Sequence, residues 1–287
     1  MVIETFEFAV SPSISLRADR YGPAHGAPVL LLHGSGQTRW SWEQTARSLG
    51  QLGDGGMAVY AVDLRGHGDS GWCPDGDYRI DMFAADVGAI VDALDAPPVI
   101  VGASMGGLAA LLACGELPRA ACAGIVLVDI APLIELKGSN RVGGFMRKTL
   151  EGFASLDEAA AAIAAYSGRT RDGRKEGLLK NLRQGADGRY RWHWDPAVMA
   201  RRDDDPEFDE FQARLVAAAE AIAEPILIVR GGDSDVLSRE TMVRMREILP
   251  QVKQAEIPGA RHMIAGDDNA KFFSAIMPFL VAHARKV

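Results

Sequence analysis

Gly102-Ala-Ser-Met-Gly106 is the stretch that decides the fold, because a strand-like run, Pro98-Val-Ile-Val101, leads directly into it. Apolar, helix-forming sequence, Leu108-Ala-Ala-Leu-Leu-Ala-Cys114, follows shortly after it. A serine between two glycines at a strand-to-helix junction is typical of a nucleophile elbow, a turn too tight for flanking side chains. Such a turn lifts the Ser104 hydroxyl off the sheet edge and directs the helix N-terminus at an oxyanion formed there. Ser104 is therefore a candidate nucleophile.

Further apolar runs extend this strand into a predicted sheet. They are Val29–Leu32, Ala58–Val62, Val99–Val101, Gly124–Val128 and Ile226–Val229, with a weaker run at Val252–Ile257. Helical stretches separate most of them, at Trp42–Leu52, Arg79–Leu94, Met105–Leu117 and Ser238–Leu249. Alternating sequence at residues 3–10 and 13–19 predicts an antiparallel hairpin with one solvated face. We therefore expect an α/β protein with a mostly parallel, doubly wound sheet of about eight strands.

The strand pattern breaks in the middle of the chain. Residues 134–222 hold the Ala-rich stretch Asp157–Tyr166, the segment Trp192-His-Trp-Asp-Pro196 and an acidic run, but no comparable strand. We interpret residues 134–222 as a mostly helical insertion into a core formed by residues 1–133 and 223–287. The spacing leaves open whether the segment at 192–196 packs on the core or contacts a ligand.

The composition excludes several classes of function. The chain has 287 residues, 48% of them hydrophobic, and a net charge of −7. It has no basic stripe, so we expect no nucleic-acid partner. It has no run of about 18 apolar residues, so we expect no membrane partner. The oligomeric state stays open.

The cysteines and the N-terminal sequence bear on the compartment. Cys73, Cys114 and Cys122 are too few to form a disulfide framework and are typical of a reducing compartment. The sequence Met1-Val-Ile-Glu-Thr-Phe-Glu7 lacks the basic and apolar regions of a secretory signal. We therefore expect a cytoplasmic protein.

A serine nucleophile needs a base to take its proton and a third group to orient that base. His262 is the best candidate base, because it follows the last strand and a short loop. Asp235, in the loop after Ile226–Val229, is the first choice for the orienting carboxylate. Asp129 directly follows another predicted strand and is the alternative acid.

Together these motifs resemble the α/β-hydrolase superfamily, and specifically its capped serine hydrolases. His33-Gly-Ser-Gly36 resembles the family's oxyanion turn, and Asp63-Leu-Arg-Gly-His-Gly-Asp-Ser70 resembles its D-x-R-G-x-G-x-S loop. The order Ser104, Asp235, His262 agrees with the family order. The insertion lies where this family places its cap.

The resemblance implies a role for each matched residue. Ser104 would be the nucleophile, His262 the general base and then acid, and Asp235 the group that orients the imidazole. The backbone N–H groups of Ser35 and Met105 would form the oxyanion hole. No cofactor and no metal are expected.

Acyl-enzyme chemistry needs a partly dry cavity, which the loops and the cap would form over Ser104. The candidate lining residues are Trp40, Phe145, Trp192, Trp194 and Ile264. A mainly apolar pocket favours a hydrophobic acyl or aromatic substrate, and the expected partner is a small molecule.

The leading hypothesis is a serine hydrolase that forms an acyl-enzyme with a small or medium hydrophobic ester, lactone or thioester. Serine rather than aspartate at the elbow argues against epoxide hydrolase and dehalogenase chemistry. Two alternatives with the same residues are a C–C bond hydrolase of aromatic-degradation diketones and a cofactor-free perhydrolase or haloperoxidase. A small-molecule receptor of the same fold is the non-enzymatic alternative.

Overall fold

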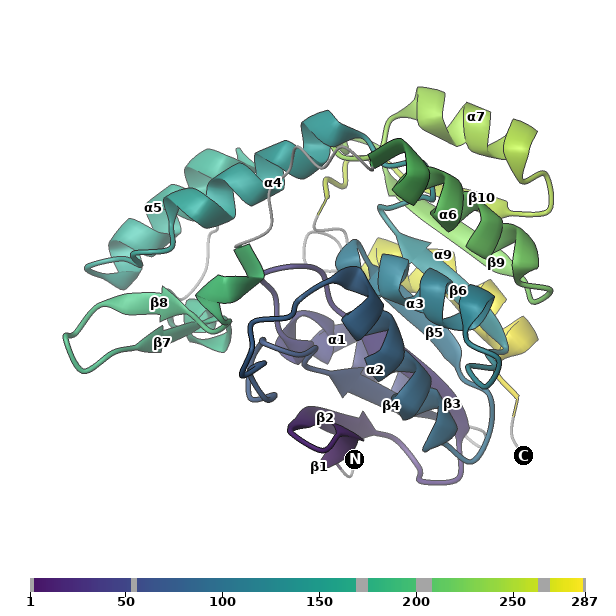
Figure 1. The fold of residues 1–287 in the computed structure, drawn as a ribbon, viewed down its shortest axis with the longest axis horizontal. Helices are drawn as coiled ribbons and strands as arrows, with labels where there is room; N and C mark the ends of the chain where they lie inside the picture. Colours follow the sequence, from purple (N-terminus) through teal and green to yellow (C-terminus); the bar gives the residue numbers. More distant parts are fainter. Residues whose placement is uncertain (1–2, 53–55, 169–174, 200–207, 263–268, 286–287) are drawn as a thin grey trace.

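An eight-stranded sheet forms the centre of the molecule (Figure 1). The computed structural model describes residues 3–52, 56–168, 175–199, 208–262 and 269–285. The strands are β1 (Ile3–Ser11), β2 (Ile14–Tyr21), β3 (Ala27–Leu32), β4 (Met57–Val62), β5 (Val99–Ala103), β6 (Gly124–Val128), β9 (Ile226–Gly231) and β10 (Lys253–Ile257). Their order in the sheet is β1-β2-β4-β3-β5-β6-β9-β10. The hairpin β1–β2 is antiparallel and joins β4 antiparallel, whereas all pairs from β4 to β10 are parallel. The predicted fold class is confirmed.

Helices cover both faces of this sheet, which explains the continuous apolar runs of its strands. In β3, Val29 and Leu31 face a core cluster that includes residues of α1 and α9, whereas Leu30 and Leu32 face the cluster with α2 and α3. The helices are α1 (Glu43–Gly50), α2 (Ile80–Asp92), α3 (Met105–Glu116), α6 (Phe208–Ala221), α7 (Arg239–Ile248) and α9 (Asn269–His283).

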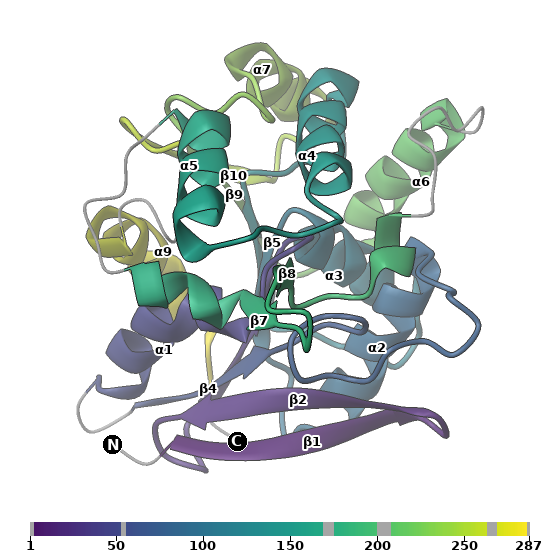
Figure 2. The same ribbon diagram turned by 90° about the vertical axis from the view of Figure 1, so that its left-hand side faces the viewer.

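A smaller layer lies beyond the carboxyl ends of the parallel strands, on the left in Figure 1 and toward the viewer in Figure 2. It contains α4 (Leu136–Lys148), α5 (Leu156–Ser167), the 3-10 helices at Lys175–Lys180 and Pro196–Met199, and the hairpin β7 (Leu182–Gln184) and β8 (Tyr190–Trp192). We call this layer the cap layer. The sequence did not predict the hairpin, because strands of three residues give too short an alternation to stand out.

Helix α6 lies within residues 134–222 but does not belong to the cap layer. Its residues Leu215, Ala218 and Ala219 join the main core cluster beside α3. The chain therefore returns to the helical layer on the sheet at α6. We had expected that return only after residue 222, where the predicted insertion ends.

Candidate active site

Ser104 lies in a strained turn between β5 and α3. Its backbone has φ 45° and ψ −118°, a region that residues with a side chain rarely adopt. The turn requires glycine on both sides. A Cβ on Gly102 would lie 2.6 Å from the backbone nitrogen of Gly107, and one on Gly106 would lie 2.7 Å from the carbonyl oxygen of His33. These close approaches are the physical reason for the glycines around Ser104.

The turn at residues 33–36 packs directly against this elbow. A Cβ on Gly34 would lie 3.3 Å from the Cβ of Ser104, and the Ser35 hydroxyl donates to the sulfur of Met105 at 3.4 Å. Met105 is the first residue of α3, so its N–H has no partner within the helix. Among the described residues, the backbone N–H groups of Ser35 and Met105 have no acceptor. Both donors are therefore available to a ligand oxygen.

Two buried neutral histidines support this turn. His33 donates through Nδ1 to the carbonyl of Gly34 at 2.8 Å and accepts at Nε2 from the N–H of Leu64 at 3.0 Å. His67 accepts at Nε2 from the N–H of Gly36 at 3.2 Å. Burial lowers the pKa of His33 to about 4 and that of His67 to about 3. Both rings therefore stay uncharged near neutral pH and serve as structural braces.

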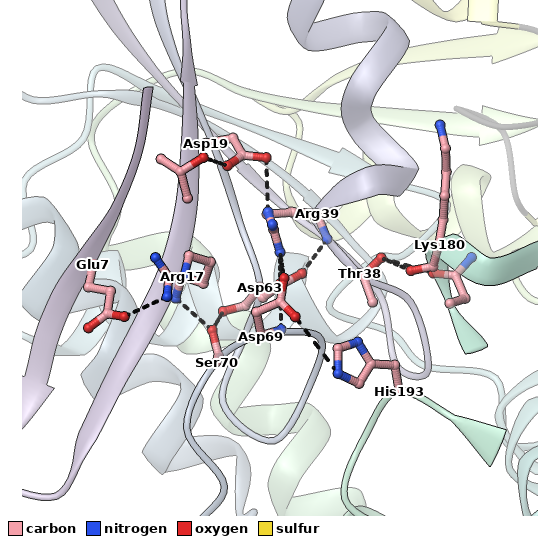
Figure 3. Close-up of polar contacts among 12 residues, drawn as sticks. Glu7, Arg17, Asp19, Thr38, Arg39, Asp63, Asp69, Ser70, Lys180 and His193 are labelled. Atoms are coloured by element: carbon pink, nitrogen blue, oxygen red, sulfur yellow. Dashed lines mark hydrogen bonds and ion pairs between the residues drawn. The ribbon is translucent and has the colours of Figure 1, made fainter. Parts of the chain in front are cut away.

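A buried ion cluster fixes the chain that follows the turn (Figure 3). The Arg39 guanidinium contacts Asp63 and donates to Asp19 at 2.9 Å and Asp69 at 2.8 Å. Burial opposes the charge of Arg39, but the three carboxylates outweigh it and raise the pKa of the guanidinium. Burial also disfavours the charged form of Asp63 and so raises its pKa, although the charge of Arg39 opposes that shift. The cluster joins β2, the chain that follows the turn at residues 33–36, and the loop after β4.

The segment Trp192–Pro196 docks the cap layer on this turn. Trp194 is only 3% exposed and forms an antiparallel bridge with His67. A Cβ on Gly36 would lie 2.9 Å from the terminal methyl of Met146 and 3.6 Å from Nε1 of Trp194. The segment Trp192–Pro196 therefore packs the cap layer against the core, and Trp194 lies beside the turn at residues 33–36.

The other candidate lining residues have individual environments. Phe145 stacks on Tyr166 with ring centres 4.2 Å apart, and its ring meets that of Trp192 edge-on at 6.1 Å. The ring of Trp40 lies 4.9 Å from the guanidinium carbon of the preceding arginine. Ile264 lies outside the described residues. Phe145 and Trp192 thus belong to one aromatic cluster of the cap layer, whereas the partly buried ring of Trp40 faces Arg39 and Lys180 of the cap layer.

His262 forms its hydrogen bond with Asp129. The distance from Nδ1 of His262 to Oδ2 of Asp129 is 2.9 Å, and the carboxylate has no exposed surface. Asp129 directly follows β6, the neighbour of β5, and the backbone N–H of Ser104 donates to Val128 at 3.3 Å. Ser104 and Asp129, with φ values of 45° and 52°, are the two non-glycine residues with positive φ in the described part of the chain. Such strain is concentrated at functional sites.

Asp235 takes a different position from the one expected. Its carboxylate forms an ion pair with Arg141 of α4, and 38% of its side chain is exposed. In the structure His262 is therefore hydrogen-bonded to Asp129, the alternative acid, and not to Asp235, the first choice. The reason is geometric: Asp129 leaves its strand at the sheet edge beside the elbow, whereas Asp235 lies further along the loop after β9.

One residue of the site, Ser234, was missed by the sequence reasoning. Ser234 donates to Oδ2 of Asp129 at 2.5 Å. Arg261 precedes the candidate base and donates to the carbonyl of Ser167, at the C-terminal end of α5. A cation is favourable at that end of a helix dipole. Neither contact has a local sequence signal, because each joins segments that are distant along the chain.

Within the described ranges, no three His, Cys, Asp or Glu side chains gather so as to hold a metal ion. The helices of the same ranges include none with the length and apolar character needed to cross a membrane.

Comparison with known sequences gives matches over most of the chain. Residues 27–268 match the family described as alpha/beta hydrolase fold. The chain is 30% identical over 252 residues to the 3-hydroxybutyrate-oligomer hydrolase of Cupriavidus necator, covering 84% of each chain. It is 29% identical over 273 residues to the N-formylmaleamate deformylase of Pseudomonas putida, covering 91% of each chain.

Comparison with solved structures agrees with the fold. The crystal structure of E-2-(acetamidomethylene)succinate hydrolase superposes with a TM-score of 0.82 at 22% identity, covering 98% of this chain and 100% of that one. The sequence match, the sheet order and the elbow geometry point to the same conclusion. The chain belongs to the α/β-hydrolase superfamily and is a hydrolase of that fold.

Proposed function

We propose that this hydrolase acts through Ser104, His262 and Asp129 as a catalytic triad. The observation that carries the proposal is the 2.9 Å bond between His262 and the buried carboxylate of Asp129, next to the elbow. Asp129 accepts the Nδ1 proton of His262, which leaves Nε2 free to act as a base. This triad keeps Ser104 and His262 as the sequence predicts them and takes the alternative acid, Asp129, in place of Asp235.

The proposed reaction proceeds through an acyl-enzyme. The hydroxyl of Ser104 attacks the ester carbonyl while His262 takes its proton, and the backbone N–H groups of Ser35 and Met105 stabilise the oxyanion. His262 then returns the proton to the leaving alcohol. Water, activated by the same imidazole, hydrolyses the acyl-enzyme and releases the acid.

The substrate that we propose is a small or medium carboxylic ester with a hydrophobic acyl group. The cap layer brings Met146 and Trp194 against the oxyanion-type turn, and its cluster of Phe145, Tyr166 and Trp192 supplies further apolar surface. Apolar lining with a few polar donors is typical of small-molecule sites. The name of the relative that hydrolyses 3-hydroxybutyrate oligomers supports ester chemistry.

A substitution at the nucleophile tests this function. Turnover of p-nitrophenyl esters from acetate to decanoate, and labelling by a fluorophosphonate, should both be lost in Ser104→Ala. The exposed Ser274 of α9 offers a matched control, because Ser274→Ala removes a serine far from the elbow in sequence. Retained turnover in Ser104→Ala would overturn the proposed mechanism.

The same protein distinguishes the alternative reactions. Ring-cleavage diketones and a peroxide-dependent dye halogenation assay would be run beside the ester panel. If only the diketone assay or only the halogenation assay gives turnover that depends on Ser104, the ester assignment is wrong while the triad stands. If the intact protein gives no turnover and no adduct in any assay, a receptor role is favoured instead.

A further inference from the structure

Ser234 lies in the loop after β9, where the sequence had led us to expect the catalytic acid. Its hydroxyl oxygen accepts hydrogen bonds from the backbone N–H groups of Val236 and Leu237, both at 3.1 Å. A serine hydroxyl has two acceptor positions and one proton to donate. With both acceptor positions filled, the proton is directed at the carboxylate of Asp129, 2.5 Å away.

Asp129 depends on such donors. Its side chain is fully buried, and its backbone has φ 52°. A buried carboxylate is costly unless hydrogen bonds satisfy it. Oδ1 accepts from the N–H of Gly231 at 2.8 Å, whereas Oδ2 accepts from both Ser234 and His262. The Ser234 hydroxyl and the imidazole therefore share one oxygen.

We propose that Ser234 is a positioning residue, which orients the Asp129 carboxylate so that Oδ2 faces the Nδ1 proton of His262. This inference rests on the proposed triad. The loop after β9 thus supplies a hydroxyl group that donates to the carboxylate of Asp129, which follows the neighbouring strand β6. Because the two amides fix the hydroxyl, the direction of its proton is set before substrate binds.

Loss of this hydroxyl should act on the chemical step rather than on substrate binding. Within the described part of the chain, Ser234 is hydrogen-bonded to Asp129, Gly231, Val236 and Leu237, and none of these is proposed to line the pocket, so KM should stay unchanged. We expect kcat to fall by about 10- to 100-fold, the rate equivalent of one hydrogen bond to a charged group. The downfield proton NMR resonance of the His262 Nδ1–H should move, because its acceptor changes environment.

The test compares substitutions within one loop. Ser234→Ala and Ser234→Cys remove the strong donor, and the thiol variant keeps nearly the same shape if the alanine variant folds poorly. Ser234→Thr keeps the hydroxyl and should restore kcat and the resonance. Ser238→Ala is the matched control, because Ser238 caps α7 by accepting from the N–H of Thr241 at 3.0 Å and has no bond to Asp129.

The outcomes separate this inference from the proposed function. A loss of kcat in the Ala and Cys variants, with unchanged KM and rescue by Thr, supports it. The inference is overturned if these variants behave like Ser238→Ala in both kcat and the resonance. If Ser104→Ala and Asp129→Asn themselves retain turnover, the proposed triad has failed rather than the role of Ser234 alone.

Discussion

Replacing Asp129 by asparagine tests the assignment of the acid most directly. Three donors point at this buried carboxylate: the N–H of Gly231, the hydroxyl of Ser234 and Nδ1 of His262. An amide has one oxygen and one NH₂ group. Whichever way the amide is turned, its NH₂ group meets at least one of these donors.

The two orientations have different consequences, and both impair the site. With the NH₂ group toward Gly231, two donors oppose each other in a buried space. With the NH₂ group toward His262, the imidazole must carry its proton on Nε2 and can no longer accept the proton of Ser104. In the Ser-His-Asp template this loss of tautomer costs about 10⁴-fold in kcat, which corresponds to about 5.4 kcal/mol in the barrier.

The assay is steady-state hydrolysis of p-nitrophenyl butyrate by Asp129→Asn, with Asp235→Asn as its matched control. The pair between Asp235 and Arg141 is partly exposed, with side-chain exposures of 38% and 46%. Its loss should therefore change stability by about 0–1 kcal/mol and leave kcat nearly unchanged. The reasoning is refuted if Asp235→Asn loses more activity than Asp129→Asn while both proteins remain folded.

Further predictions concern the framework of the turn. Arg39→Met leaves the carboxylates of Asp63 and Asp19, 0% and 3% exposed, without their partner, so the free energy of unfolding should fall by about 3–5 kcal/mol in denaturant titrations. A loss below about 1 kcal/mol would contradict a buried cluster. His33 and His67 have pKa values lowered by burial from 6.5 to about 4 and about 3. Below pH 6.5 these rings bind protons in the unfolded chain but stay neutral in the folded one. The free energy of unfolding should therefore fall as the pH is lowered, by up to about 1.4 kcal/mol per pH unit for each ring. Denaturant titrations at pH 7 and pH 5 check this, and equal midpoints at both would argue against two buried neutral rings.

The sheet and the elbow could be predicted from local sequence. Apolar runs covered on both faces, such as Val29–Leu32, have a pattern that depends only on neighbouring residues. The glycines around Ser104 also have a local cause, since close backbone approaches exclude a Cβ at Gly102 and Gly106. For these features the chain carries its own signal within a few residues.

The cap layer was harder to predict from the same kind of signal. The hairpin of β7 and β8 has strands of three residues, too short for a period to emerge. Helix α6 has the sequence of an ordinary helix, and only its contact with α3 shows that it belongs to the sheet's helical layer. Assignment of a helix to a layer depends on its partner rather than on its own residues.

The sequence by itself therefore determined the α/β class and pointed to the turn at Ser104 and to His262 as the candidate base, because each depends on short-range pattern and order. Only the tertiary structure shows that His262 is hydrogen-bonded to Asp129, whereas Asp235 pairs with Arg141. Both follow strands of the sheet and both lie between Ser104 and His262 in the chain, so sequence order does not separate them. The choice depends on which loop meets the imidazole, and that follows from the adjacency of β5, β6 and β9 and from the positive φ of Asp129. Ser234 entered the site for the same reason, since its hydroxyl meets Asp129 only once those strands are side by side.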